Sequence, residues 1–312
     1  MSEPHKGDGA EDEFVKLLQE HQQATSEGRH QDVNVLSMQM MALAVARAKE
    51  EPPSQWTLLM REAQRREAEG NWEGAEAAYR QVLGLADEKE HDIGQFNIHQ
   101  ALARLHRMLG QNALSFQEAQ LATQAARRTE VTPLILRALE IQAASALRLK
   151  DVTAAQEAVS ESFEILASKG SRSDLQRAIT LILRAQCQVE GNDLSAVEAD
   201  LKAAWDILQP QCGALFLAGV HSGLARWWVA TARLRTRRND LPGAVGACRE
   251  AVDRCRHLAT LPQLGGPYWY ANLADSVYGL SQALAAAGEV AEAEAMLAES
   301  QALRSAIGLP LR

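Results

Sequence analysis

The stretch Gly70-Asn-Trp-Glu-Gly-Ala-Glu-Ala-Ala-Tyr-Arg-Gln-Val-Leu-Gly-Leu85 contains the pattern that decides the fold of this chain. A glycine followed by an asparagine is typical of a tight turn that ends a helix, because glycine adopts the left-handed conformation without steric cost. The residues after the turn predict a second helix, in which Ala75, Tyr79 and Val82 share one face. The stretch therefore predicts a helix hairpin that packs through this face.

Versions of this stretch recur along the whole chain. With the turn residue as marker, successive copies stand 40 to 49 residues apart. The markers are Gly28, Gly70, Gly110, Lys150, Asn192, Asn239 and Gly288. A period in this range is typical of a solenoid, in which each repeat buries the apolar face of its neighbour.

Small residues recur at fixed distances from the marker. Alanine or serine stands seven residues before it in every copy except the first, where the residue is His21. The small residues are Ala63, Ala103, Ala143, Ala185, Ala232 and Ser281. Positions five and twelve residues after the marker are also mostly small, for example Ala155 and Ala204. Small side chains at such places let antiparallel helices approach to the short end of the range of about 8–10 Å.

The stretch from Gly70 to Leu85 resembles the tetratricopeptide repeat (TPR), whose order of turn glycine, alanine, aromatic and small residue it follows. Trp228, with Ala232 four residues on, is similar to the opening of such a repeat. The resemblance covers about residues 10–306. It implies an all-α fold, a right-handed α-solenoid of about seven antiparallel helix pairs. The period here is longer than the usual repeat of about 34 residues, which predicts longer helices.

The pattern predicts a polar, disordered tail over residues 1–9 and a single solenoid domain over residues 10–312. The expected helix pairs are 11–26 with 31–50, 54–69 with 72–87, 92–109 with 112–128, 132–149 with 152–168, 172–190 with 193–208, 214–238 with 241–259, and 268–287 with 290–306. In the last helix, Met296, Leu297, Leu303 and Ile307 have no later helix to cover them. This uncapped C-terminal helix predicts self-association or a partner contact.

Composition bounds the function. The net charge is −8, which argues against generic nucleic-acid binding. No apolar stretch is long enough for a membrane span, and the N-terminus lacks the apolar core of a signal peptide. A cytoplasmic protein that binds neither nucleic acid nor membrane is therefore expected.

Catalytic and metal-binding motifs are missing from the sequence. It contains no phosphate-binding glycine loop, no Gly-x-Ser-x-Gly, no His-Glu-x-x-His and no Cys-x-x-Cys. Cys248, Cys255 and His257 would supply at most three ligands to a metal, and buried thiols in a reduced protein are the expectation. We expect no enzyme activity, no catalytic residue, no metal and no cofactor.

An arginine-rich segment stands out against the acidic whole. Between Gly213 and Pro262, eight arginines face only three acidic residues. The arginines are Arg226, Arg233, Arg235, Arg237, Arg238, Arg249, Arg254 and Arg256. One interpretation is a solvated face whose arginine stems cover apolar surface. The other is a site for carboxylates or phosphates, whose geometry the arginine fork matches.

The resemblance implies that the first helix of each pair lines a concave inner surface, where family members hold extended peptides. Helical phase relative to the small positions assigns seven residues to this surface. These candidate partner-binding residues are Asn97, Arg104, Arg137, Arg226, Arg233, Tyr278 and Gln282.

The sequence thus predicts a non-enzymatic scaffold that binds a peptide or protein along its concave face, with the arginine-rich sixth pair favouring acidic groups of the partner. The alternative is a regulatory sensor that binds a peptide or effector and changes curvature. The few residues before the first expected helix leave no room for a DNA-binding motif, so such a sensor is expected to pass its signal to another protein.

Overall fold

The structure is a computed structural model. It describes residues 54–88, 91–168, 174–191, 193–211, 218–261 and 266–311, and the helical positions Lys16, Leu17, Glu20 and Gln23. Contacts divide the chain into two units, Met1–Leu58 and Leu59–Arg312. The predicted tail and first helix pair lie almost wholly outside the described residues, so the expected domain boundaries stay predictions.

All regular elements in the described part of the chain are helical, which confirms the all-α prediction. The helices are α3 (Gln55–Ala68), α4 (Trp72–Glu88), α5 (Asp92–Met108), α6 (Asn112–Arg128), α7 (Thr132–Leu149), α8 (Val152–Ser168), α9 (Asp174–Gln188), α10 (Leu194–Leu208), the short 3-10 helix η1 (Gln209–Gln211), α11 (Ala218–Arg237), α12 (Leu241–Thr260), α13 (Pro267–Ala286) and α14 (Val290–Ala306). Each of the α-helices begins and ends within a few residues of its predicted bounds, whereas η1 was not predicted. None of these helices is long and apolar enough to cross a membrane.

The predicted marker residues that the structure describes end their helices in the left-handed conformation. Positive φ angles occur at five of them, namely Gly70 (72°), Gly110 (78°), Lys150 (65°), Asn239 (59°) and Gly288 (83°). The next residue often caps the following helix. The Asp151 and Asp240 carboxylates accept hydrogen bonds from the backbone N–H groups of Ala154 and Gly243, at 3.0 and 2.9 Å. The paired turn residues therefore work as a helix stop followed by a helix start.

The small positions lie where helices cross. All those in the described repeats are buried, including Ala63, Ala155 and Ala204, which are fully covered. Ser115 Oγ on α6 donates a hydrogen bond of 2.9 Å to the Ala103 carbonyl on α5. A side chain can reach the backbone of the neighbouring helix only when the two helices approach closely. The periodic small residues thus set the packing of the pairs.

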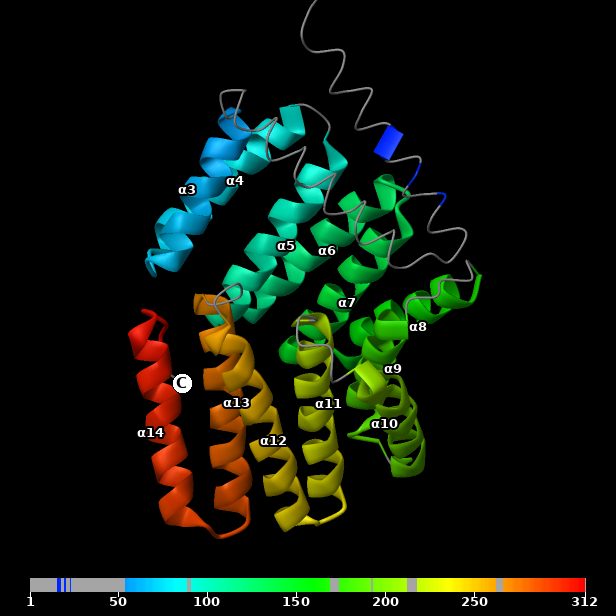
Figure 1. The fold of residues 1–312 in the computed structure, drawn as a ribbon, viewed down its shortest axis with the longest axis vertical. Helices are drawn as coiled ribbons and strands as arrows, with labels where there is room; N and C mark the ends of the chain where they lie inside the picture. The colour runs from blue at the N-terminus through cyan, green and yellow to red at the C-terminus, as the bar shows by residue number, and fades with distance from the viewer. Residues whose placement is uncertain are drawn as a thin grey trace, which may run out of the picture. The chain divides into compact units, whose positions relative to one another are not determined.

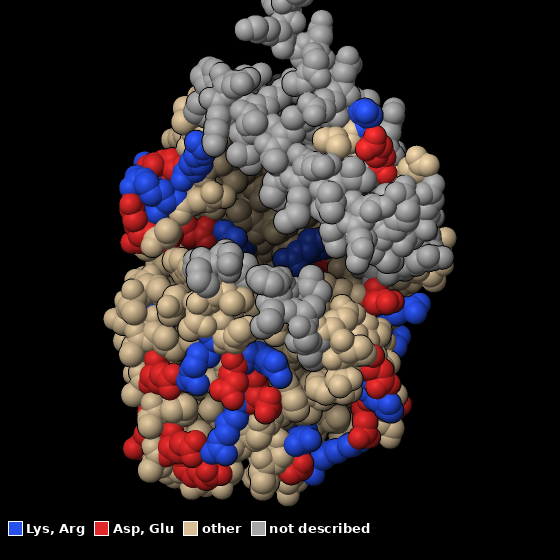
Figure 2. All heavy atoms as spheres, viewed as in Figure 1, with Lys and Arg blue, Asp and Glu red and all other residues tan. Residues whose placement is uncertain are grey.

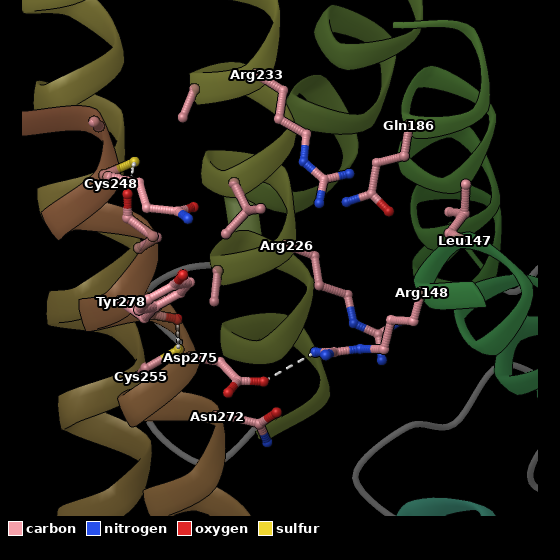
Figure 3. Close-up of a pocket in the computed structure, with 18 of the residues that line it drawn as sticks. Leu147, Arg148, Gln186, Arg226, Arg233, Cys248, Cys255, Asn272, Asp275 and Tyr278 are labelled. Carbon is pink, nitrogen blue, oxygen red and sulfur yellow. Dashed lines mark hydrogen bonds and ion pairs between the residues drawn. The ribbon is translucent and has the colours of Figure 1, made fainter. Parts of the chain in front are cut away.

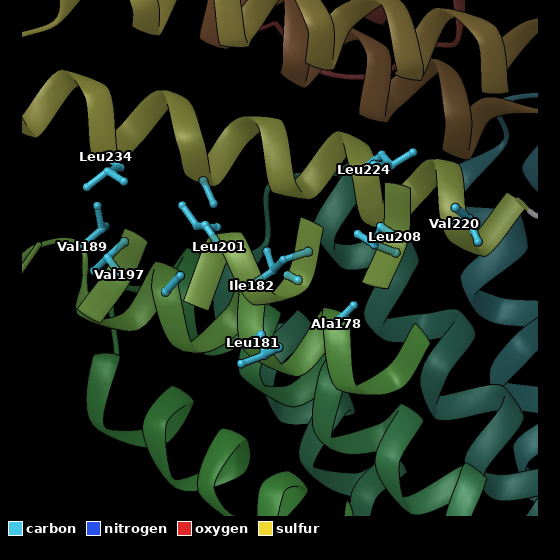
Figure 4. Packing of buried hydrophobic residues seen from close by; sticks show 13 residues of the cluster. Ala178, Leu181, Ile182, Val189, Val197, Leu201, Leu208, Val220, Leu224 and Leu234 are labelled. Carbon is cyan, nitrogen blue, oxygen red and sulfur yellow. The ribbon is translucent and has the colours of Figure 1, made fainter. Parts of the chain in front are cut away.

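Larger apolar side chains fill the space between successive pairs. In the cluster between α9, α10 and α11, Ile182, Leu208 and Leu224 are almost fully buried (Figure 4). Burying each such side chain contributes about 1.5–3 kcal/mol relative to leaving it in water. This cluster holds α11 against the preceding pair and so positions the arginines that α11 carries.

The helices follow one order of contacts. The second helix of each pair packs on the first helix of the next pair, as α6 does on α7 and α12 on α13. In addition, the first helices α5, α7, α9 and α11 contact one another in series (Figure 1). They therefore form a common wall, as the resemblance implied.

The end of the array contacts its beginning within the second unit. Trp72 Nε1 on α4 donates to the Gly308 carbonyl after α14, at 2.9 Å. Arg304, only 2% exposed, donates to the Met108 carbonyl at the end of α5 and forms an ion pair of 3.2 Å with Asp275 on α13. Helices α5 and α13 are also in direct contact. The last pair is thus tied to the α4–α5 region.

The contacts of this junction bear on the prediction that the C-terminal helix α14 is uncapped. Met296 and Leu303 pack against a buried cluster formed by α11–α14, and Leu297 and Ile307 are half-buried. No later helix covers α14, but Arg304 in its last turn contacts α5, and Gly308 just after the helix contacts α4. The sequence analysis did not expect this cover, because α4 and α5 are remote in sequence. Self-association through the helix stays a prediction.

Candidate functional site

A cavity of about 580 Å³ lies between α7 and α9 on one side and α11–α13 on the other. Its volume is within the range of about 300–1,000 Å³ that is typical of ligand pockets. Leu147, Leu183, Val229 and Leu258 contribute to apolar walls. Polar side chains project into it from α9, α11 and α13 (Figure 3). Apolar walls with a few polar groups are the usual composition of a binding site.

One face of α13 provides a wall of the cavity. Tyr268, Asn272, Asp275, Gly279 and Gln282 follow one another at three- and four-residue steps, which places them on one side of the helix. Gly279 has no side chain, and a Cβ built there would meet nothing within 4 Å. Part of the cavity therefore exists because this position is glycine.

Positive charge predominates among the lining residues. The cavity is lined by five arginines, Arg107, Arg148, Arg226, Arg233 and Arg237, and by two carboxylates, Glu190 and Asp275. This excess lies in a protein whose net charge is −8. What each arginine offers a ligand depends on its partners within the chain.

Arg226 is held by a buried carboxylate. Glu140 on α7 is 2% exposed and lies 2.6 Å from Arg226 and 2.8 Å from Arg137. Burial alone would raise the pKa of Glu140, but the charges of Arg226 and Arg137 outweigh it and lower the pKa. A charged carboxylate thus joins α7 to α11 at this end of the cavity.

Tyr268 lies among arginines of the inner wall. The guanidinium carbon of Arg104 lies 5.6 Å and that of Arg107 5.0 Å from the centre of the Tyr268 ring. Burial alone would raise the pKa of the phenol, but the charges of Arg107, Arg226 and Arg137 lower it to about 7. The phenol oxygen of Tyr268 thus gives the chain an internal acceptor near the four arginines Arg104, Arg107, Arg137 and Arg226.

Asp275 links the cavity wall to the junction of the array. One carboxylate oxygen accepts from Arg148 on α7 at 3.1 Å, and the other accepts from Arg304 on α14 at 3.2 Å. Nearby, Arg107 donates to Asn272 at 3.4 Å. These contacts connect α13 with α5, α7 and α14.

Arg233 differs from the other arginines of the cavity. It is exposed, and no carboxylate of the described residues lies within ion-pair distance of it. Figure 3 shows its guanidinium facing the amide of Gln186 on α9 across the cavity. This is the end of the cavity where positive charge is left without an internal partner.

The seven predicted partner-binding residues fall into three groups. Arg226, Arg233, Tyr278 and Gln282 line the cavity together. Arg104 and Arg137 do not line it, and their guanidinium groups pair with Glu67 at 2.7 Å and with Glu140. Asn97 is exposed on α5 outside the cavity. Contact of any of them with a ligand stays a prediction.

The arginine-rich segment is mostly an ion-paired surface. In the described part of the chain, Arg237 pairs with Glu190, Arg238 with Glu198, Arg249 with Glu292 and Arg256 with Glu299. Each partner belongs to a neighbouring helix or to the residues just after it. Figure 2 shows the resulting alternation of blue and red side chains over α11–α14. The acidic partners of these arginines lie outside the arginine-rich segment, so the folded surface is closer to neutral than the sequence of the segment indicates.

The possible metal ligands Cys255 and His257 have different neighbours and do not form a common site with Cys248. Cys255 Sγ lies 3.2 Å from the Ser276 hydroxyl, whereas the His257 ring packs 5.0 Å from His221. Burial raises the pKa of Cys255, and raises that of Cys248 to about 11. The described residues hold no group of three or more side chains arranged to bind a metal ion.

Sequence reasoning missed several lining residues, among them Gln186, Arg148, Tyr268 and Asp275. The regular spacing on α13 was a usable signal for Tyr268 and Asp275, because they share a helix face with the predicted Gln282. Gln186 and Arg148 had no comparable signal. They face the cavity only because α7 and α9 lie opposite α13 in the folded chain.

Comparisons with known proteins bear on the fold. Neither a protein-family model nor a curated protein sequence matches the chain. Among solved structures, a Rap protein in complex with competence and sporulation factor has a TM-score of 0.57 at 9% identity, with 96% of this chain and 98% of that chain covered. The apo form of RapI has a TM-score of 0.52 at 13% identity, with 81% of this chain and 98% of that chain covered. The chain thus has a TPR-like α-solenoid fold.

Proposed function

We propose that this chain is a non-enzymatic interaction module that binds a short peptide, or the end of a protein partner, in the cavity between α7, α9 and α11–α13. The observation that carries the proposal is the cavity itself, which combines apolar walls with an excess of arginine. Apolar surface contributes affinity, and a few directional polar groups determine which ligand binds.

The polar groups of the cavity favour a peptide. Gln186, Asn272 and Gln282 contribute amide side chains, which both donate and accept hydrogen bonds as peptide units do. Among the solved structures of similar fold, one Rap protein was determined with competence and sporulation factor bound. That complex is consistent with a binding role for a fold of this kind.

A cavity-filling variant tests the proposal. Gly279→Leu places a large side chain in the cavity without altering any arginine, and nothing lies within 4 Å of its first carbon. A pool of random pentapeptides is passed over the immobilised full chain, and the retained peptides are identified by mass spectrometry. Calorimetry then measures their affinity. We expect Gly279→Leu to weaken binding at least about tenfold, because the leucine occupies space that the peptide needs.

The matched control is Gly246→Leu. Gly246 is an exposed helical glycine on α12, also with nothing within 4 Å of an added Cβ, and it does not line the cavity. This variant should bind peptides as the wild type does. Equal affinity in the wild type and both variants would move the site out of the cavity, and no retained peptide at all would overturn the peptide-binding function.

A second candidate function, the regulatory sensor, is favoured by contacts that cross the cavity. The Arg148–Asp275 ion pair and the Arg107–Asn272 hydrogen bond join α13 to α7 and α5. A ligand that takes up these arginines would change the contacts between helices. Small-angle scattering of the full chain with and without a retained peptide tests this, since a scaffold predicts superimposable profiles and a sensor predicts a shift.

A further inference from the structure

We propose that an apolar slot between α11 and α13, which opens from the cavity, binds an unbranched alkyl chain. The chain belongs to a fatty acid or to an acyl group attached to a peptide. This inference goes beyond the proposed peptide binding, because it assigns a second class of ligand to one part of the cavity. An opening in the inner wall, the shape of that opening and the side chains that line it support the proposal.

The inner wall is interrupted between α11 and α13. The first helices α5, α7, α9 and α11 contact one another in series, but within the described residues α11 and α13 have no comparable contact. Both pack instead on α12, the second helix of the sixth pair. Among the described residues that line the cavity, those of α12 are the only ones from the second helix of a pair. The cavity therefore reaches through the wall of first helices to α12.

One straight face of α12 forms the floor of the slot. Its lining residues follow one another at three- and four-residue steps, which places them on one side of the helix. They are Leu241, Ala244, Cys248, Ala251, Cys255 and Leu258. At a rise of about 1.5 Å per residue, this face covers roughly 25 Å. The slot is therefore much longer than any single amino-acid side chain.

Small residues line both sides of the slot. Ala225 and Ala232 line it from α11, and Gly279 and Ala283 line it from α13. A Cβ added at Gly279 would meet nothing within 4 Å. At the other helix crossings small residues are matched by a close approach, whereas α11 and α13 carry them without packing on each other. A narrow, straight space remains, and its shape fits an unbranched chain.

The floor of the slot offers no polar group to a ligand. The only polar side-chain atoms of α12 that line it are two thiols, and both have partners. Cys248 Sγ donates to the Gly279 carbonyl at 3.9 Å, and Cys255 Sγ lies 3.2 Å from the Ser276 hydroxyl. A peptide backbone on this floor would leave N–H and C=O groups without partners, which costs free energy. An alkyl chain has no such groups, so the slot favours it over a peptide backbone.

The opposite side of the cavity indicates where the polar part of the ligand lies. Arg226, Arg233 and Gln186 line the cavity from α11 and α9. Figure 3 shows Cys248 and Cys255 across the cavity from Gln186. A head group therefore faces the polar side chains of α9 and α11, and the alkyl chain enters the slot above α12.

Binding is measured with trans-parinaric acid, an unbranched polyene fatty acid whose fluorescence rises in apolar surroundings. The full chain should raise this fluorescence, and saturated fatty acids of eight, twelve and sixteen carbons should displace the probe. Their affinity should increase by up to about fourfold for each methylene group that enters the slot. Adamantane carboxylic acid, which has the carboxylate but a compact ring system in place of the chain, should not compete.

Two variants fill the slot from different helices. Ala283→Leu on α13 and Cys248→Leu on α12 each enlarge a half-buried residue that lines it. Each should weaken the binding of trans-parinaric acid at least about tenfold, because the leucine occupies space that the chain needs. Ala285→Leu is the matched control, since Ala285 is exposed on α13 and does not line the cavity. Circular dichroism checks that each variant folds, and either slot variant alone suffices for the test.

A second arm separates the two sources of the chain. A pool of random pentapeptides with an N-terminal palmitoyl group is compared with the same pool carrying an acetyl group, by retention on the immobilised full chain. Displacement of the probe by palmitic acid, with equal retention of the two pools, identifies a free fatty acid as the ligand. Stronger retention of the palmitoyl pool identifies an acylated peptide.

The outcomes separate the slot from the proposed peptide binding. Unchanged probe fluorescence together with equal retention of the two pools would overturn the slot, as would an affinity that does not depend on chain length. Unchanged binding of the probe by both slot variants would also overturn it. If the acetyl pool is still retained by the wild type in these cases and lost in Gly279→Leu, peptide binding stands without the slot. Fatty-acid binding without any retention of the acetyl pool would leave the slot and overturn the binding of unmodified peptides.

Discussion

Arg226 and Arg233 lie two turns apart on the same face of α11, and the sequence predicts the same partner-binding role for both. In the structure they have different surroundings. Arg226 is partly buried and lies 2.6 Å from the buried Glu140, whereas Arg233 is exposed and faces an amide. The comparison teaches that the partner of an arginine, and not its residue type or helix face, separates a structural cation from one that is available to a ligand.

The difference follows from the cost of burying charge. A carboxylate as deeply buried as Glu140 stays ionised only with cations beside it, so Arg226 and Arg137 are both needed where they are. Replacing Arg226 by glutamate would put two carboxylates together at this place and destabilise the fold. Loss of binding in such a variant would not identify a ligand contact, which is why Arg233 is the better position to probe.

The largest expected effect comes from Glu140→Gln. The change leaves two guanidinium groups without their carboxylate, and we expect a loss of about 2–3 kcal/mol in the free energy of unfolding. This is below the roughly 3–5 kcal/mol for a fully buried pair, because both arginines are partly exposed. Chemical denaturation measures the loss. The control is Glu198→Gln, which removes the exposed partner of Arg238. An equal or smaller loss of unfolding free energy in Glu140→Gln would mean that the buried ion pairs stabilise the fold no more than an exposed one.

The same carboxylate has a pH signature. The folded-state pKa of Glu140 is lowered, so its stabilisation is fully present above the unfolded pKa of about 4.3 and is lost as the pH falls through the folded value. Below about pH 4.3 the wild type should therefore lose stability more steeply than Glu140→Gln. Parallel pH profiles for the two proteins would contradict the assignment.

An intermediate effect is expected from Tyr268→Phe, which removes the phenol but keeps the ring. The folded pKa of about 7 lies below the unfolded value of about 10, so the free energy of unfolding should rise between these pH values in the wild type. We expect a difference of about 1–2 kcal/mol at the upper end, since the half-buried ring allows solvent to screen part of the interaction. Ultraviolet titration should show one tyrosine ionising near pH 7 in the wild type and none in the variant.

The smallest effect on stability is expected from Arg233→Gln. Because Arg233 is exposed and has no internal carboxylate partner in the described structure, its replacement should change the free energy of unfolding by no more than about 0.5 kcal/mol. Denaturation of the variant beside Glu140→Gln measures the contrast directly. A large destabilisation would show that Arg233 has a structural role like that of Arg226, and the two ends of the cavity would no longer differ.

Local features of the chain were predictable because their causes are local. Gly70, Gly110, Lys150, Asn239 and Gly288 end helices through their own backbone conformation, and the residues after them cap the next helix through bonds that span three positions. The alanine and serine positions could be assigned to helix crossings for a similar reason. Their spacing repeats with the hairpin, so each copy reports on the same contact.

The candidate site was only half predictable. The inner-wall phase identified Arg226, Arg233, Tyr278 and Gln282 as a group, and the structure brings them to one cavity. Helical phase alone could not predict that Glu140, 86 positions before Arg226, pairs with the Arg226 guanidinium. It also could not predict that Gln186 faces Arg233. Such pairings depend on which helices meet across the array and not on the sequence around either residue.

The sequence by itself determined the helices, their ends, their pairing into hairpins and the small residues through which they cross, because backbone conformation and periodic burial act over a few turns. Only the tertiary structure decided that the last pair returns to α4 and α5, where Trp72 bonds to a carbonyl 236 positions away. It also decided which arginines are neutralised and which is left facing the cavity. The physical reason is that charge compensation and closure depend on distances between remote segments, and these exist only once every hairpin has stacked on its neighbour.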